Sequence, residues 1–132
     1  MKLIIGGYSQ GKLNYVLQKE AADNYVIFDG MLPEDKKLQE AARQEKKVII
    51  NHFHNWVKER ISQGKSPEEE VYAFVKKCPD CTVISDEIGN GIVPIDAFER
   101  EYRERTGRIL VELASQADEV VRVICGIGQK IK

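Results

Sequence analysis

The sequence has no hydrophobic run long enough to cross a bilayer, so it contains no candidate transmembrane helix. Its first apolar stretch, Leu3-Ile4-Ile5, is too short for a signal peptide and runs directly into glycines. Three cysteines do not make a disulfide framework, which fits a reducing compartment. We therefore expect a cytoplasmic protein that makes no membrane contact.

The chain also lacks an excess of charge of either sign. Its 20 basic and 21 acidic residues leave a formal net charge of -1. No sequence-wide field therefore attracts nucleic acid or an anionic membrane. A phosphate ligand would have to be held by a local group of residues. At 132 residues the chain is expected to form one domain.

Short apolar runs alternate with helical patterns along the chain, which is typical of a mostly parallel sheet with crossover helices. We expect strands at residues 2–5, 25–28, 48–50, 81–84 and 119–124, the last followed by a short tail. Helices are expected from the glycines to about residue 23, from Pro33 to about 44, and from Trp56 to Ile61. Two more should begin at Ser66 and Asp96. The fold class is therefore α/β.

A phosphate-binding loop follows the first strand. Its residues are Gly6, Gly7, Tyr8, Ser9, Gln10, Gly11 and Lys12. Strand, G-x-x-x-x-G-K and helix in that order predict a three-layer fold like that of P-loop nucleoside triphosphatases. The glycines allow main-chain N–H groups to approach phosphate oxygens, the helix start adds partial positive charge, and Lys12 reaches the outer phosphates. The plainer interpretation is a tight glycine turn; the complete pattern favours nucleotide binding.

Leu13 departs from this motif. The residue after the lysine is normally Ser or Thr, whose hydroxyl holds Mg²⁺, and leucine offers no oxygen. Cradling of phosphate by the backbone should survive this change. Metal-assisted phosphoryl transfer should be impaired, so Mg²⁺ is expected to contribute only weakly.

A later stretch carries the strongest resemblance to a known family. Residues Ser85-Asp86-Glu87-Ile88-Gly89-Asn90-Gly91-Ile92-Val93-Pro94 resemble a segment of the bifunctional adenosylcobinamide kinase / adenosylcobinamide-phosphate guanylyltransferase family of cobalamin biosynthesis. The likeness continues at Trp56, at Arg100 and Arg103, at Thr106-Gly107-Arg108, at Ala114, at Ala117-Asp118-Glu119-Val120 and in the tail Gly126-Ile127-Gly128-Gln129-Lys130. It covers the first thirty residues and nearly everything from Lys47 onward.

The resemblance implies binding of GTP or ATP and phosphorylation of a corrinoid, adenosylcobinamide. It further implies transfer of GMP through a histidine-bound intermediate, and a homo-oligomer. Four departures fall at the functional positions of the family. Leu13 replaces the metal-binding hydroxyl, Asn51 replaces an acidic residue, and Leu110-Val111 replace an Asn-Gln pair. The segment of residues 31–46, where the family carries its acceptor histidine, contains none.

Polar residues at strand ends are the remaining candidates. Asp29 and Asn51, which end the second and third strands, and Glu87 are taken with the loop as nucleotide-binding residues. Asp86 and Glu87 follow a buried strand, where carboxylates of α/β sheets point into the ligand crevice. Asp86 is a candidate Mg²⁺ ligand in place of the lost carboxylate; the alternative is that both are ordinary turn acids.

His52 and His54 are the only histidines. If the third strand continued through them they would point in opposite directions. Either could accept GMP in place of the missing histidine, because imidazole is nucleophilic near neutral pH. The plainer interpretation, a helix-start or surface histidine, is preferred.

Two further groups have an ordinary interpretation. Cys78-Pro79-Asp80-Cys81 has metal or redox spacing, but it follows a helix and has too few partner ligands, so it is taken as a structural turn. Arg100, Arg103, Arg105 and Arg108 are interleaved with glutamates, so a solvated, salt-paired helix is expected, although they could contact a phosphate.

Two functions therefore remain open from the sequence. The first is a shortened kinase/guanylyltransferase that keeps one or both activities. The second is a catalytically impaired nucleotide-binding relative that acts through binding or assembly.

Overall fold

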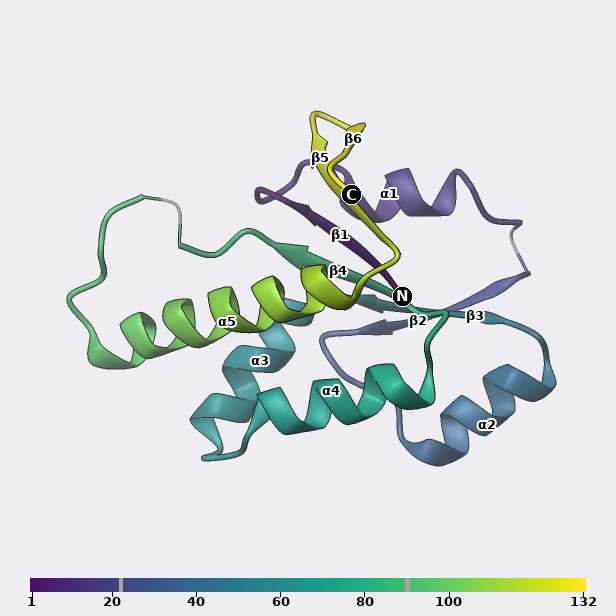
Figure 1. The fold of residues 1–132 in the computed structure, drawn as a ribbon, viewed down its shortest axis with the longest axis horizontal. Helices are drawn as coiled ribbons and strands as arrows, with labels where there is room; N and C mark the ends of the chain where they lie inside the picture. Colours follow the sequence, from purple (N-terminus) through teal and green to yellow (C-terminus); the bar gives the residue numbers. More distant parts are fainter. Residues whose placement is uncertain (22, 90) are drawn as a thin grey trace.

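Five apolar segments form parallel strands, and a sixth strand closes one edge of the sheet (Figure 1). The computed structural model describes residues 1–21, 23–89 and 91–132. The strand order is β2-β3-β4-β1-β5-β6. The strands are β1 (Lys2–Gly6), β2 (Tyr25–Asp29), β3 (Lys47–Asn51), β4 (Thr82–Asp86), β5 (Glu119–Ile124) and β6 (Ile127–Lys130).

Helices connect the parallel strands. They are α1 (Lys12–Leu17), α2 (Asp35–Arg43), α3 (Phe53–Ser62), α4 (Pro67–Lys77) and α5 (Ala97–Gln116). Asp96 begins α5 as expected, because its carboxylate accepts hydrogen bonds from the amides of Phe98 and Glu99. The expected mostly parallel α/β architecture is confirmed.

Three of the parallel strands end in a polar residue at the same edge of the sheet. Gly6 at the end of β1 is level with Asp86 of β4 and with Val123 of β5. Asn51 at the end of β3 is level with Asp29 of β2. Parallel strands all end at the same edge of their sheet, so this edge collects the residues that follow each strand.

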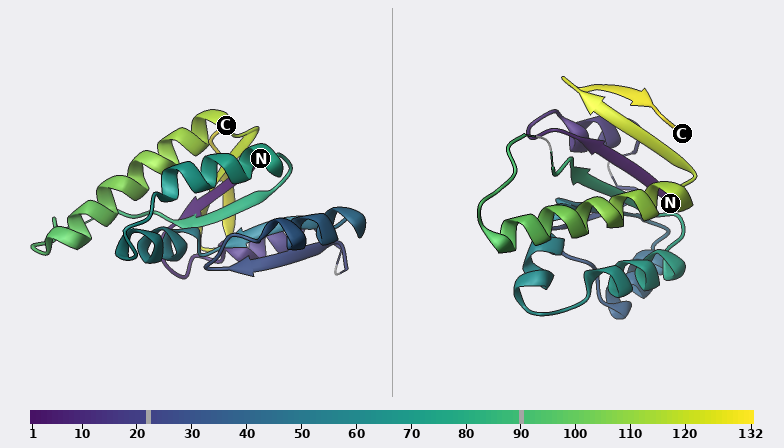
Figure 2. Two further views of the ribbon diagram at one scale, coloured as in Figure 1. Left: turned by 90° about the horizontal axis from the view of Figure 1, so that it is seen from below. Right: turned by 60° about the vertical axis from the view of Figure 1, so that its left-hand side comes forward.

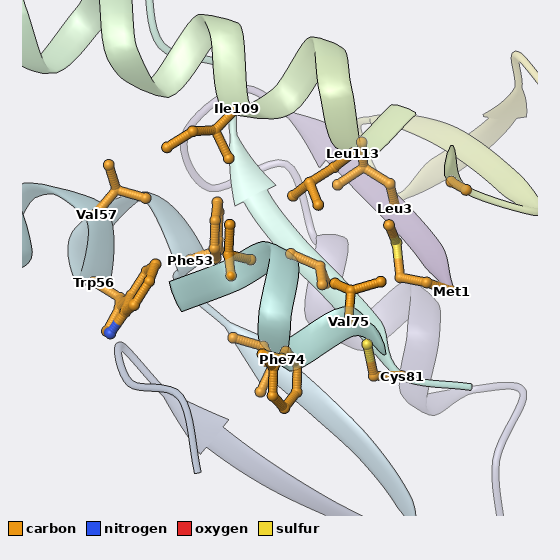
Figure 3. Close-up of a cluster of buried hydrophobic side chains, with 14 of the residues drawn as sticks. Met1, Leu3, Phe53, Trp56, Val57, Phe74, Val75, Cys81, Ile109 and Leu113 are labelled. Atoms are coloured by element: carbon orange, nitrogen blue, oxygen red, sulfur yellow. The ribbon is translucent and has the colours of Figure 1, made fainter. Parts of the chain in front are cut away.

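Apolar side chains pack on both faces of the sheet. On one face α3, α4 and α5 cover Leu3, Ile50 and Val83, and Figure 3 shows Phe53, Ile109 and Leu113 meeting there. Figure 2 shows α5 lying along this face with α4 beside it. On the other face Val16 of α1 packs with a smaller set: Ile4, Ile49, Ile84, Val121 and Val123. Successive side chains of β1 point to opposite faces of the sheet, as strand geometry requires.

Three boundaries differ from the sequence predictions. α1 ends at Leu17 rather than near residue 23, because the amides of Lys19 and Glu20 turn back to carbonyls only three residues earlier. α2 begins at Asp35, so Pro33 precedes the helix instead of lying in its first turn. The expected tail is strand β6, which turns back at Cys125 and Gly126 and pairs antiparallel with β5.

No helix in residues 1–21, 23–89 and 91–132 is both long and apolar enough to cross a membrane.

Phe53 gives a direct test of the larger core. Its side chain is fully buried beneath α5, whereas Val111 on α5 is 71% exposed. We expect Phe53→Ala to lower the free energy of unfolding by about 3–5 kcal/mol, because it leaves a cavity. Val111→Ala should change it by less than about 0.5 kcal/mol. Urea unfolding followed by circular dichroism measures both, and equal losses would contradict the packing described.

Candidate functional site

The loop after β1 is shaped by a close backbone approach at Gly6. A β-carbon there would lie 2.5 Å from the carbonyl oxygen of Val123, so no larger residue fits without moving β5. Farther along the loop, Ser9 and Gly11 have left-handed backbone angles, with φ of 54° and 84°. Left-handed residues that alternate with other conformations along a loop let main-chain amides converge on an anion.

The turn between β5 and β6 holds the loop from the side. The amide of Gly126 donates to the carbonyl of Gln10 at 2.8 Å, and the amide of Cys125 donates to Oε1 of the same residue at 2.7 Å. Sequence reasoning missed this support, because the contact joins residues more than a hundred positions apart. The recognised tail motif around Gly126 was the only signal.

Lys12 places a buried ammonium at the end of the loop. The residue is only 7% exposed. Its Nζ donates to the carbonyl of Gly7 at 2.7 Å and lies 2.6 Å from Oδ1 of Asp86. A buried ammonium needs such partners, because an unpaired charge out of water is costly. Two residues chosen from separate motifs in the sequence therefore meet in the structure.

His54 holds Asp86 from the opposite side. Nδ1 of His54 accepts the Asp86 backbone N–H at 3.1 Å, and Nε2 lies 3.3 Å from Oδ2 of Asp86. Since Nδ1 accepts a hydrogen bond, the neutral ring carries its proton on Nε2, facing the carboxylate. Burial lowers the pKa of His54 below 6.5, outweighing the opposing effect of Asp86.

Asn51, His52 and Asp29 form a second polar group at the ends of β2 and β3. Nδ2 of Asn51 donates to Oδ1 of Asp29 at 3.1 Å, and Nδ1 of His52 lies 2.5 Å from the same oxygen. The third strand does not continue through the two histidines, because β3 ends at Asn51 and α3 begins at Phe53, so both lie at the start of a helix, as the preferred interpretation has it. The rings of His52 and His54 instead meet edge to face, with centroids 5.8 Å apart.

A cavity of about 510 Å³ lies between these groups. Its lining includes the predicted residues Tyr8, Ser9, Gln10, Gly11, Lys12, Leu13, Asn51 and Asp86, and also Asn14, His52, His54, Asn55, Ile84 and Ser85. Three predicted residues do not line the cavity but contact residues that do or shape the loop. Gly6 allows the close approach to β5, Gly7 accepts a hydrogen bond from Lys12, and Asp29 accepts one from Asn51. The sequence alone did not predict that His54 and Asn55 lie beside the phosphate loop.

Glu87 lies outside this cavity. Successive residues at the end of β4 point to opposite faces, so Asp86 faces the loop while Glu87 faces α5. There Nε of Arg122 lies 2.7 Å from Oε1 of Glu87, in a groove that Leu110 and Val111 also line. The expectation that both carboxylates enter one crevice was therefore wrong for Glu87.

The arginines of α5 divide into two pairs. Arg105 pairs with Glu68 and Glu101, and Arg108 pairs with Glu104, as expected for a salt-paired helix. The other two hold the segment after β4: Arg103 donates to the carbonyls of Ile92 and Gly89, and Arg100 donates to that of Pro94. Asn90, part of the quoted segment, lies outside the described residues.

The residues of the cavity do not form a metal site by themselves. Within the described ranges no three His, Cys, Asp or Glu side chains are grouped to hold a metal ion. Asp86 is the one carboxylate among the described lining residues, and its two oxygens face Lys12 and His54. Leu13 adds no oxygen. A protein-held Mg²⁺ therefore does not fit this arrangement.

Cys78 and Cys81 form the expected turn. The amide of Cys81 donates to the carbonyl of Cys78 at 3.2 Å between α4 and β4, and both thiols are free.

The comparison with protein families matches most of the chain. A family model described as cobinamide kinase / cobinamide phosphate guanyltransferase matches residues 18–131. The chain belongs to this family. The match begins after the phosphate loop, so the interpretation of residues 6–13 depends on their sequence pattern and geometry.

Curated relatives agree with this family. The chain is 38% identical over 69 residues to the bifunctional adenosylcobalamin biosynthesis protein CobU of Salmonella typhimurium, an alignment covering 49% of this chain and 38% of that protein. It is 37% identical over 79 residues to the protein of the same name from Escherichia coli K12, covering 58% and 44%. The matched region therefore spans less than half the length of these relatives.

The buried His54 should make stability depend on pH. Because the pKa of His54 is lowered in the folded protein, the unfolded chain binds a proton that the folded chain does not, at pH values between the lowered pKa and 6.5. The free energy of unfolding should therefore fall on acidification through this window, by at most about 1.4 kcal/mol per pH unit from this group.

His54→Gln is the matched variant. Its amide can accept from the Asp86 N–H and donate to the carboxylate without titrating. Urea unfolding between pH 7.5 and 5 should show a smaller acid loss in this variant than in the wild type. Parallel curves would refute the assignment of His54 as a buried neutral base.

Proposed function

We propose that the loop cavity binds the phosphate groups of a purine nucleoside triphosphate, GTP or ATP. The observation that carries this proposal is the buried ammonium of Lys12 at the end of a glycine loop. Among the residues that the structure describes, its counter-charge is the Asp86 carboxylate, whose Oδ1 lies 2.6 Å from Nζ. An incoming phosphate would replace that carboxylate as the partner of Lys12, and the left-handed residues of the loop would present amides to it. The chain would act as one nucleotide-binding domain.

We further propose that the chain transfers the γ-phosphoryl group to a hydroxyl of adenosylcobinamide. Membership of the family supports this substrate. Guanylyl transfer by the route that the family resemblance implies is disfavoured, because residues 31–46 contain no histidine. A cytoplasmic homo-oligomer is proposed from the same likeness. Leu13 makes the transfer slow, since it supplies no metal ligand.

The alternative is a relative that binds nucleotide without turnover. The features that favour it are Leu13 and the amide of Asn51, which bonds to Asp29 rather than offering a carboxylate to the cavity. Incubation with γ-labelled GTP or ATP and adenosylcobinamide separates the two functions. Labelled corrinoid indicates a kinase, and calorimetric binding without labelled product indicates the alternative.

Lys12 provides the test of binding. We expect Lys12→Met to weaken GTP and ATP binding roughly 10- to 100-fold, because it removes charge-assisted hydrogen bonds worth about 1.5–3 kcal/mol. Isothermal titration calorimetry measures the change. Lys37→Met, on the exposed surface of α2, should bind like the wild type. Unchanged affinity in Lys12→Met, or no binding by the wild type, would overturn the proposal.

Leu13 provides the test of metal dependence. Wild-type affinity for the triphosphate should scarcely change when Mg²⁺ is replaced by EDTA. Leu13→Ser should make the affinity increase with Mg²⁺, because its hydroxyl supplies a hard oxygen ligand. Leu13→Ala removes the same packing of Leu13 against the smaller apolar cluster without adding an oxygen, so it controls for lost stability. An equal Mg²⁺ response in all three proteins would contradict this role for position 13.

A further inference from the structure

His52 occupies an unusual place between β3 and α3. It is a non-glycine residue with a left-handed φ of 51°, which costs on the order of 1 kcal/mol or more. It is also the residue before the first turn of α3, yet its side chain makes no capping hydrogen bond to that helix. Helix capping therefore does not account for this ring. The ring lines the cavity that contains Lys12.

The Asp29 carboxylate sets the orientation of the His52 ring. Nδ1 of His52 lies 2.5 Å from Oδ1 of Asp29, and a carboxylate can only accept, so Nδ1 carries the proton. The amide of Asn51 donates to the same oxygen at 3.1 Å and so steadies the carboxylate. In the neutral ring Nε2 is then left with a lone pair. An imidazole oriented by a carboxylate in this way is the usual arrangement of a general base.

Charge in the cavity is divided between two separate groups. Asp86 lies against Lys12, and His54 lies against Asp86. Nδ1 of His54 accepts the Asp86 N–H and the proton on Nε2 faces the carboxylate, so His54 has no free lone pair for a substrate. Asp86 is already paired with the ammonium. Among the described residues that line the cavity, His52 is the one whose contacts leave a basic nitrogen available.

We propose that His52 is a catalytic residue whose Nε2 accepts the proton of the hydroxyl that receives the γ-phosphoryl group. This inference rests on the kinase function proposed above. The bond between the hydroxyl oxygen and the γ-phosphorus forms, and the bond from that phosphorus to the bridging oxygen breaks. The bonding electrons leave with the nucleoside diphosphate, whose charge Lys12 stabilises, and the proton moves to Nε2.

Two variants test this role without disturbing the backbone. Asparagine and glycine both tolerate left-handed angles, so His52→Asn and His52→Gly should fold. Turnover is measured with γ-labelled GTP or ATP and adenosylcobinamide. We expect kcat to fall roughly 10²- to 10⁴-fold in both variants, the usual contribution of a general base. Calorimetric affinity for the triphosphate should stay at the wild-type value. Added imidazole should raise the rate of His52→Gly but not that of the wild type.

The outcomes separate the two proposals. If the wild type binds neither triphosphate, the proposed function falls and this role falls with it. If the wild type binds nucleotide but transfers no phosphoryl group, only binding survives. Wild-type kcat in His52→Asn, or a His52→Gly rate that imidazole does not raise, would overturn the role of His52 and leave the kinase function standing.

Discussion

The absence of a side chain at Gly6 is the constraint on which the site depends. β1 lies between β4 and β5, and a β-carbon at Gly6 would collide with the Val123 carbonyl on β5. The same β-carbon would press on the aliphatic stem of Lys12, whose Cδ would be 3.3 Å away. Because this space is free, the stem of Lys12 can pass over the strand end and bring its ammonium to Asp86.

The Lys12 ammonium is the group for which the Asp86 carboxylate and a bound phosphate would compete. Without phosphate, Lys12 is neutralised by Asp86 and bonded to the Gly7 carbonyl, so no buried charge is unpaired. His54 fixes Asp86 through both its main chain and its carboxylate. A phosphate bound as proposed would have to compete with this carboxylate for Lys12, and main-chain amides of the loop would supply the additional hydrogen bonds. Such a local exchange would let a protein of near-zero net charge bind an anion.

Two of the departures from the family pattern, Leu13 and Asn51, line the cavity. Asn51 does not leave a gap where a carboxylate is expected, because its amide donates to the Asp29 carboxylate that also faces Nδ1 of His52. Leu13 contributes to the apolar packing around α1 instead of to a metal. Arg103 donates to the carbonyls of Ile92 and Gly89 and so holds the segment after β4, which is the stretch that most resembles the family. The described residues of the site thus retain the buried lysine of the glycine loop but supply no cluster of metal ligands.

The sequence by itself determined the α/β class, the order of the elements from β1 to β5, and the family. These features are local, since glycine positions, capping residues and apolar periods act over a few residues. The tertiary structure alone decided that Asp86 faces Lys12 while Glu87 faces Arg122, and that His54 is buried against Asp86. It also decided that Cys125 and Gly126 support Gln10. Such contacts depend on which way each strand end points and on pairing between distant segments, and local pattern carries neither.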